Sequence, residues 1–114
     1  MSPRTIFLHG WGLHGGIWSE TLAALAGVAP YLPGYGGRPM PAPYSAESLA
    51  DALAETVTTP VTLIGWSMGG MVALALAARH PGKVAKLVLV GASPAFVNRP
   101  GWEHGLAPEV LAGF

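Results

Sequence analysis

The stretch of the chain that decides the fold reads Val61-Thr62-Leu63-Ile64-Gly65-Trp66-Ser67-Met68-Gly69-Gly70. Its first four residues predict a short buried strand, and the residues from Met71 to Arg79 have the composition of a helix. Ser67 therefore stands at a tight turn between a strand and a helix, with Gly65 and Gly69 two positions to either side. Glycine has no Cβ to clash where the strand and helix come close, and it tolerates strained backbone angles. We expect this turn to lift the Ser67 hydroxyl above the edge of a sheet.

Short apolar strands alternate with helices along the chain. Strands are predicted at residues 4–8, 28–32, 61–64 and 84–90, and helices at 17–26, 45–57, 71–79 and, as a last short stretch, 108–112. Such alternation is typical of an α/β fold with a parallel sheet and right-handed crossovers. Ligands of such sheets bind at the carboxyl ends of the strands, where Ser67 and the glycine-rich segment 9–16 are expected to lie. From residue 93 onward the composition becomes that of a loop.

The composition excludes several classes of function. The chain has 114 residues, of which 51% are hydrophobic and 11% charged, and its formal net charge is zero. There is no basic stripe, so nucleic acid is not an expected partner, and no apolar run is long enough to predict a membrane span. The sequence has no cysteine and no helical His-x-x-x-His pair, so neither a metal site nor a cofactor is predicted. The lack of cysteine and of a signal-peptide pattern favours a cytoplasmic protein.

Ser67 is the candidate catalytic residue. A serine hydroxyl that attacks a carbonyl group needs two preorganised donors for the oxygen that becomes negative. One is expected to be the N–H of Met68, and the other the N–H of Trp11 in the segment His9-Gly10-Trp11-Gly12. Two other interpretations stay open: Ser67 as a structural N-cap of the helix, and the glycine-rich segment as a turn in which Trp11 only packs.

Three further side chains lie close to these motifs in the sequence. His9 is expected to shape the glycine-rich loop, and Trp66 is expected either to line an acyl pocket or to pack. His80 stands at the C-terminus of the helix after Ser67, where an imidazole can bond the free carbonyl groups.

A base for Ser67 is missing from the sequence that follows it. Serine needs a histidine to take its proton and an acid to orient that histidine. No aspartate follows Ser67, and Glu103 and His104 are adjacent and in the wrong order, because this motif is normally followed by the acid and then the histidine. The strand at 84–90 would also leave an apolar sheet edge unpaired. We therefore expect this chain to be the N-terminal part of a longer enzyme.

Four segments of the chain resemble one family. They are Gly10-Trp11-Gly12-Leu13, Leu32-Pro33-Gly34-Tyr35-Gly36, Gly65-Trp66-Ser67-Met68-Gly69-Gly70 and Ala92-Ser93-Pro94-Ala95-Phe96. Together they resemble the α/β-hydrolases, in particular the BioH-type carboxylesterases, which hydrolyse the methyl ester of pimeloyl-acyl carrier protein in biotin synthesis. The resemblance implies a parallel-sheet α/β-hydrolase core, in its N-terminal portion with the serine nucleophile elbow, over residues 1–92. It also implies the start of a lid or cap over residues 93–114.

The resemblance implies a specific chemistry. Ser67 would be the nucleophile, the N–H groups of Trp11 and Met68 would form the oxyanion hole, and Gly65 and Gly69 would shape the elbow. The substrate would be an acyl ester presented on acyl carrier protein. Two alternatives stay open. One is another α/β-hydrolase, such as a general esterase, a lactonase or a carbon–carbon bond hydrolase, and the other is a non-catalytic α/β module without a catalytic triad.

Overall fold

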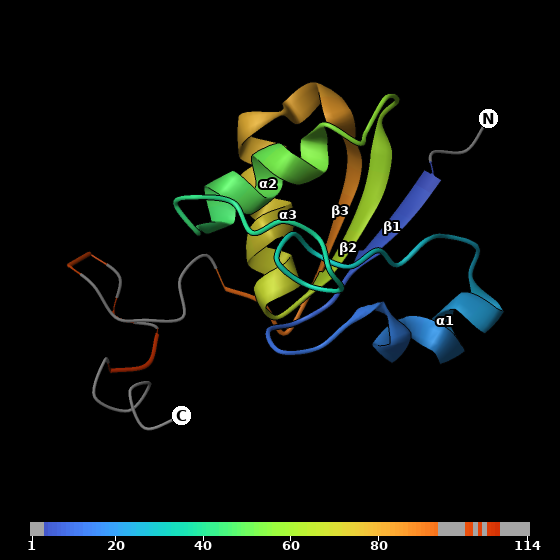
Figure 1. Ribbon diagram of the computed structural model, residues 1–114, viewed down its shortest axis with the longest axis horizontal. Helices are drawn as coiled ribbons and strands as arrows, with labels where there is room; N and C mark the ends of the chain where they lie inside the picture. Colours follow the sequence, from blue (N-terminus) through green and yellow to red (C-terminus); the bar gives the residue numbers. More distant parts are fainter. Residues whose placement is uncertain (1–3, 94–99, 102, 104, 108–114) are drawn as a thin grey trace.

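The computed structural model describes residues 4–93, 100–101, 103 and 105–107, and within them it shows a parallel sheet covered by helices (Figure 1). The strands are β1 (Arg4–Leu8), β2 (Val61–Trp66) and β3 (Val84–Val90), in the spatial order β1-β2-β3. The helices are α1 (Ser19–Ala24), α2 (Ala46–Ala54) and α3 (Met68–Arg79), with 3-10 turns η1 (Gly15–Trp18) and η2 (Pro81–Lys83). None of these helices is long and apolar enough to cross a membrane.

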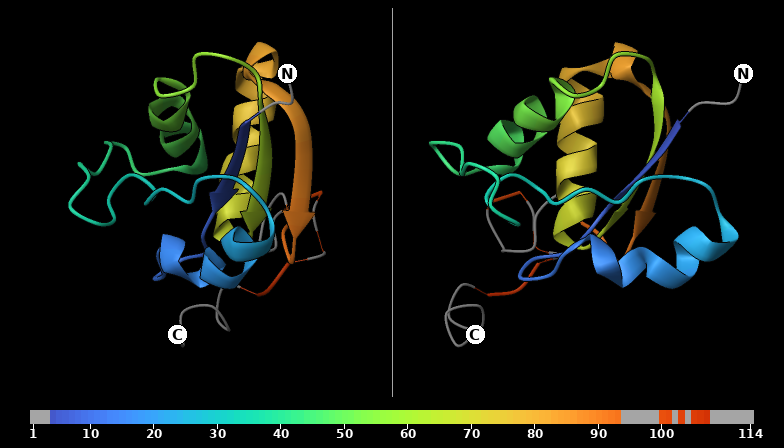
Figure 2. Two further views of the ribbon diagram at one scale, coloured as in Figure 1. Left: turned by 90° about the vertical axis from the view of Figure 1, so that its right-hand side faces the viewer. Right: turned by 45° about the vertical axis from the view of Figure 1, so that its right-hand side comes forward.

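The hydrophobic core lies between the sheet and the pair α2 and α3, which share one face (Figure 2). Side chains alternate across β2, so Val61 and Leu63 are buried in this core while Ile64 and Trp66 point to the other face. On that other face η1 packs against β1, where the rings of Phe7 and Trp18 lie 5.0 Å apart. The predicted α/β class and parallel pairing are confirmed.

Local chemistry fixes both ends of α2. Ser45 and Ser48 form a reciprocal capping box, in which each side chain bonds the backbone N–H of the other residue. At the other end, Nζ of Lys83 donates to the carbonyl oxygens of Ala54 and Val57, at 2.6 and 3.0 Å. The helix ends at Ala54 rather than at residue 57 as predicted, and tighter turns follow it, in which Thr56 and Val57 N–H groups donate to the Leu53 and Ala54 carbonyls.

A charged cluster ties α2 to the C-terminal end of α3. Arg79 donates from Nε and Nη2 to the two carboxylate oxygens of Asp51, at 2.9 and 2.7 Å, and Nε2 of His80 lies 2.7 Å from Oδ1. The prediction that the His80 imidazole bonds the free helix carbonyls was wrong, because Asp51 on the neighbouring helix is the stronger acceptor. Hydrogen bonds from Arg79, and then from His80, lower the pKa of Asp51 to about 2.

This cluster makes the stability of the fold sensitive to acid. Asp51 has a lower pKa in the folded protein than in the unfolded chain, so its ionised form stabilises the fold. This contribution to the unfolding free energy is complete above the unfolded pKa of about 3.9, and it is lost as the pH falls toward 2. We expect the unfolding free energy, measured by urea titration, to fall less steeply between pH 4 and 2 in Asp51→Asn than in the parent. Glu20→Gln removes a carboxylate that forms no ion pair within the described residues, and it serves as the control. An equal slope in all three proteins would contradict this assignment.

The predicted strand at 28–32 does not form. Only Val28 pairs with β1, through an isolated bridge to Ile6, in which Phe7 donates to the Val28 carbonyl and Val28 donates to that of Thr5. Pro30 has no N–H to continue the ladder. The N–H of Leu32 donates to the His9 ring instead, at 3.0 Å. Backbone donors that would extend a strand are thus absent or used elsewhere.

The predicted helix at 17–26 is displaced by two residues toward the N-terminus and is divided into η1 and α1, with only six residues in the α-helix. None of the residues in either element is buried, and Leu25, beyond the end of α1, is 54% exposed. A short amphipathic helix gains little stability when so few of its apolar side chains are buried, and this helix therefore ends early. By contrast, α3 starts at Met68, three residues before the predicted position, and β2 continues to Trp66.

β3 forms the edge of the described sheet, as the sequence predicted. Its residues Val88, Leu89 and Val90 are each at least 40% exposed, and α3 covers one of its faces. Most of the segment 93–114, including the helical stretch predicted at 108–112, lies outside the described residues.

Candidate active site

Ser67 has a backbone conformation that serine rarely adopts. Its φ of 57° is the only positive φ of a non-glycine residue in the described part of the chain, with ψ of −117°. The turn is held by the Ser67 N–H, which donates to the Val90 carbonyl at 3.0 Å, and by the Ser67 carbonyl, which accepts from Gly70 at 2.9 Å. The serine side chain makes no capping hydrogen bond to α3, so the structure does not support the interpretation of Ser67 as a simple N-cap. Strain of this kind in a non-glycine residue is typical of functional sites.

Close contacts explain the glycines around Ser67. A Cβ added to Gly65 would lie 2.5 Å from the carbonyl oxygen of Gly69, and one added to Gly69 would lie 2.5 Å from that of Leu8. Both neighbours are backbone atoms, which cannot move aside as a side chain can. The start of α3 therefore lies directly against the end of β1, and this contact brings the loop after β1 to Ser67.

The loop after β1 lies beside the serine. A Cβ added to Gly10 would be 3.5 Å from the Ser67 Cβ and 2.9 Å from the Trp66 ring. The Gly10 carbonyl oxygen accepts from Leu13 N–H at 3.2 Å and lies 2.8 Å from Nδ1 of His9. In a trans peptide the C=O and the following N–H point in opposite directions, so these bonds turn the Trp11 N–H away from the His9 ring. The Trp11 side chain itself is 73% exposed and takes no part in this packing.

His9 supports this loop from inside the core. The ring is fully buried, its Nε2 accepts from Leu32 N–H at 3.0 Å, and Nδ1 therefore carries the proton that bonds Gly10. Burial lowers the pKa of His9, and the nearby His14 lowers it by a smaller amount. The hydrogen bond to the Gly10 carbonyl acts in the opposite direction and raises it. With both ring nitrogens engaged in backbone bonds, His9 shapes the loop, as predicted from the sequence, and has no nitrogen free to act as the base for Ser67.

The Asp51–His80 pair has the chemistry of an acid and a base, but its position excludes it from the serine site. His80 follows the last residue of α3, whereas Ser67 precedes the first. Twelve helical residues separate them, which is about 18 Å at 1.5 Å per residue. Within the described residues, therefore, no acid–histidine pair reaches Ser67.

An apolar groove of about 300 Å³ lies next to the elbow. It is lined by Leu13, Ile17, Trp18, Thr21, Trp66 and Val90. Ser67 is not among the lining residues, and Trp66, which directly precedes it, connects the groove to the elbow. The indole N–H of Trp18 is buried without a partner in the described structure. Of the two sequence interpretations of Trp66, its position in this lining favours the pocket wall.

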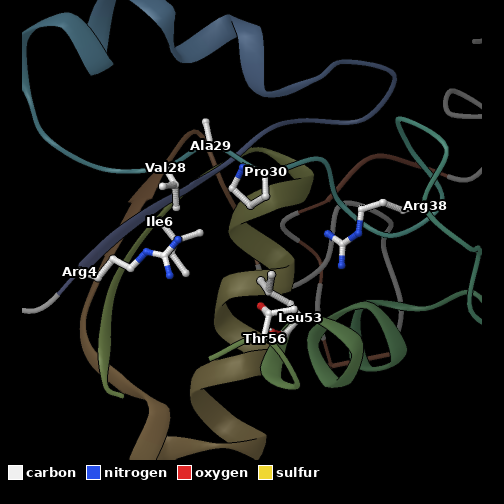
Figure 3. Close-up of a pocket in the computed structure, with 8 residues that line it drawn as sticks. All are labelled: Arg4, Ile6, Val28, Ala29, Pro30, Arg38, Leu53 and Thr56. Atoms are coloured by element: carbon white, nitrogen blue, oxygen red, sulfur yellow. Dashed lines mark hydrogen bonds between the residues drawn. The ribbon is translucent and has the colours of Figure 1, made fainter. Parts of the chain in front are cut away.

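A larger cavity lies elsewhere, at the edge of β1. It has a volume of about 530 Å³, and its lining comes from β1, the loop after α1, Arg38, and the end of α2 (Figure 3). Neither Ser67 nor Trp11 nor Met68 contributes to it. The combination of a strained serine, an ordered loop and an apolar groove makes the elbow, rather than this cavity, the candidate site.

The comparisons with known proteins agree with this geometry. Residues 3–108 match the family model described as the alpha/beta hydrolase fold. The chain belongs to the alpha/beta hydrolase family. The pimeloyl-[acyl-carrier protein] methyl ester esterase of Aromatoleum aromaticum is 46% identical over 98% of this chain and 48% of its own length. The esterase of the same name from Methylococcus capsulatus is 45% identical over 88% of the chain and 41% of its own length.

Solved structures of this hydrolase family resemble the chain as well. A structure titled marine microorganism esterase superposes with a TM-score of 0.77 at 28% identity, covering 99% of this chain and 44% of that one. A thermophilic esterase gives a TM-score of 0.76, also at 28% identity, covering 98% of this chain and 42% of that one. The chain thus spans about half the length of the hydrolases that it matches.

Proposed function

We propose that the protein is a carboxylic-ester hydrolase with Ser67 as its nucleophile. The Ser67 oxygen attacks the ester carbonyl carbon, its proton passes to a base, and the alcohol leaves with a proton to give an acyl-enzyme that water then hydrolyses. The N–H groups of Met68 and Trp11 stabilise the oxyanion of each tetrahedral intermediate. The observation that carries this proposal is the positive φ of Ser67 at a strand–helix turn beside the Gly10–Trp11 peptide.

We further propose that the substrate is the methyl ester of a pimeloyl group carried by acyl carrier protein, in cytoplasmic biotin synthesis. The names of the relatives that are 45–46% identical support this choice. The apolar groove beside Trp66 fits the methylene chain of such a substrate better than it fits a charged one. Residues 1–92 would then be part of the hydrolase core and residues 93–114 the beginning of the cap, with the acid and the histidine outside the described residues.

Two alternatives receive some support. Solved esterases with other titles superpose well, so another ester or lactone could be the substrate. The absence of a base near Ser67 among the described residues favours a non-catalytic module.

The experiment that separates these functions is a comparison of substrates with the protein as its native source produces it. We expect kcat/KM for pimeloyl-acyl carrier protein methyl ester to exceed that for a short-chain ester by at least about tenfold, since each buried methylene contributes roughly 0.8 kcal/mol. A preference for the short ester would favour a general esterase. No hydrolysis of either ester would favour the non-catalytic module.

A further inference from the structure

The Tyr35 hydroxyl contacts the loop that carries Trp11. It accepts a hydrogen bond from the Gly12 N–H at 3.0 Å, although 23 residues separate the two in sequence. The Tyr35 ring meets the His9 ring edge-on, with centroids 4.9 Å apart, and packs against the hydrophobic core. A side chain anchored in the core thus reaches the backbone of the loop directly after Trp11.

The loop is consequently held on both sides of Trp11. On the N-terminal side, the Gly10 carbonyl is fixed by His9 and by Leu13. On the C-terminal side, the Gly12 N–H is fixed by Tyr35. Gly12 has a φ of 73°, and nothing lies within 4 Å of where its Cβ would be, so local packing does not hold this residue. The Tyr35 hydroxyl therefore restrains the second half of the loop together with the turn bond from Leu13 to Gly10.

A second tyrosine supports the first. Tyr44 comes from the proline-rich loop that leads to α2, and its side chain interacts with that of Tyr35. Burial raises the pKa of Tyr44, and Tyr35 adds to this effect. The Tyr44 contact therefore helps to hold the Tyr35 side chain in place beside the loop.

We propose that Tyr35, supported by Tyr44, is a positioning residue that aims the Trp11 N–H at the oxyanion. This inference rests on the proposed function, because an oxyanion forms only if Ser67 attacks a carbonyl group. Neither tyrosine touches the reacting atoms. Tyr35 acts through the backbone of Gly12 and so through the orientation of the neighbouring peptide, and Tyr44 acts through Tyr35. Since the donor bonds the oxygen most strongly after it becomes negative, the tyrosines contribute to the transition state rather than to substrate binding.

The direct test is Tyr35→Phe in the protein as its native source produces it. The substitution removes one oxygen and keeps the ring that packs on His9 and the core. Loss of one ordinary hydrogen bond predicts a fall in kcat of roughly three- to tenfold with KM unchanged. Tyr31→Phe is the matched control, because the Tyr31 hydroxyl makes no hydrogen bond to the loop within the described structure, and its kcat should equal that of the parent.

A transition-state analogue separates positioning from a loss of folding. The probe is an aliphatic trifluoromethyl ketone, whose serine adduct carries an oxyanion. Its inhibition constant should rise in Tyr35→Phe by the same factor by which kcat/KM falls, and Tyr44→Phe should show a smaller change in the same direction. If Tyr35→Phe does not fold, Tyr44→Phe carries the test alone. An unchanged inhibition constant, or a loss confined to KM, would overturn the proposal. A parent protein that does not hydrolyse esters through Ser67 would instead refute the proposed function.

Discussion

Replacing Ser67 with alanine is expected to lower kcat for the pimeloyl methyl ester by about 10⁵-fold or more. Removing a catalytic serine costs a similar amount in serine hydrolases generally, and only the oxyanion hole and substrate binding then remain. The measurement is steady-state hydrolysis by the parent and the variant, with folding checked by circular dichroism. A variant that keeps more than about a tenth of the parent rate would show that Ser67 is not the nucleophile.

The stability of Ser67 variants provides the control. Because the side chain makes no capping bond, Ser67→Ala should leave the unfolding free energy within about 0.5 kcal/mol of the parent. Ser67→Gly should raise it by about 1 kcal/mol, since glycine adopts the φ of 57° without strain. If Ser67 were instead a structural N-cap, Ser67→Ala would lower the unfolding free energy by about 1 kcal/mol.

Replacing Gly69 with alanine is expected to impair both stability and activity. The new Cβ would lie 2.5 and 2.6 Å from the carbonyl oxygens of Leu8 and His9, so α3 and the loop after β1 must move apart. We expect the unfolding free energy to fall by roughly 1–3 kcal/mol. We also expect kcat to fall by about 100-fold, because a shift of 1 Å between catalytic groups has such an effect. Denaturant unfolding and ester hydrolysis measure the two changes.

Gly82→Ala is the matched control for this variant. Gly82 lies in η2, has nothing within 4 Å of an added Cβ, and does not have a positive φ. Alanine has a higher helix propensity than glycine at both positions, so a difference between the variants reports the steric clash at Gly69. If both variants retain the stability and activity of the parent, the close contact between α3 and β1 is not required.

The parts of the fold that could be predicted from the sequence are those in which local pattern and packing agree. The apolar run at 61–64, the glycines around Ser67 and the Pro81 that ends the helix all indicate elements that the structure contains. The strand at 28–32 was predicted from apolar residues alone. Its backbone donors decide otherwise, because Pro30 has none and that of Leu32 bonds the His9 ring.

The site was predictable to the extent that it depends on the elbow. An added Cβ at Gly65 or Gly69 would meet backbone atoms, and Ser67 has a positive φ, both of which agree with a tight elbow. The roles of Trp11 and Met68 in an oxyanion hole remain predictions. The bond from Gly12 to Tyr35 could not be predicted, because it joins residues 23 positions apart and nothing in the spacing of a Pro-Gly-Tyr-Gly turn indicates where a hydroxyl group reaches.

The measurement that tests the central claim most directly is labelling with a fluorophosphonate probe, followed by mass-spectrometric mapping of the modified peptide. The protein is the one that its native source produces, with Ser67→Ala as the negative control. The account predicts one stoichiometric adduct, on Ser67, and none in the variant. A folded protein in which Ser67 stays unmodified, or in which the adduct lies on another residue, would contradict the assignment of Ser67 as an activated nucleophile.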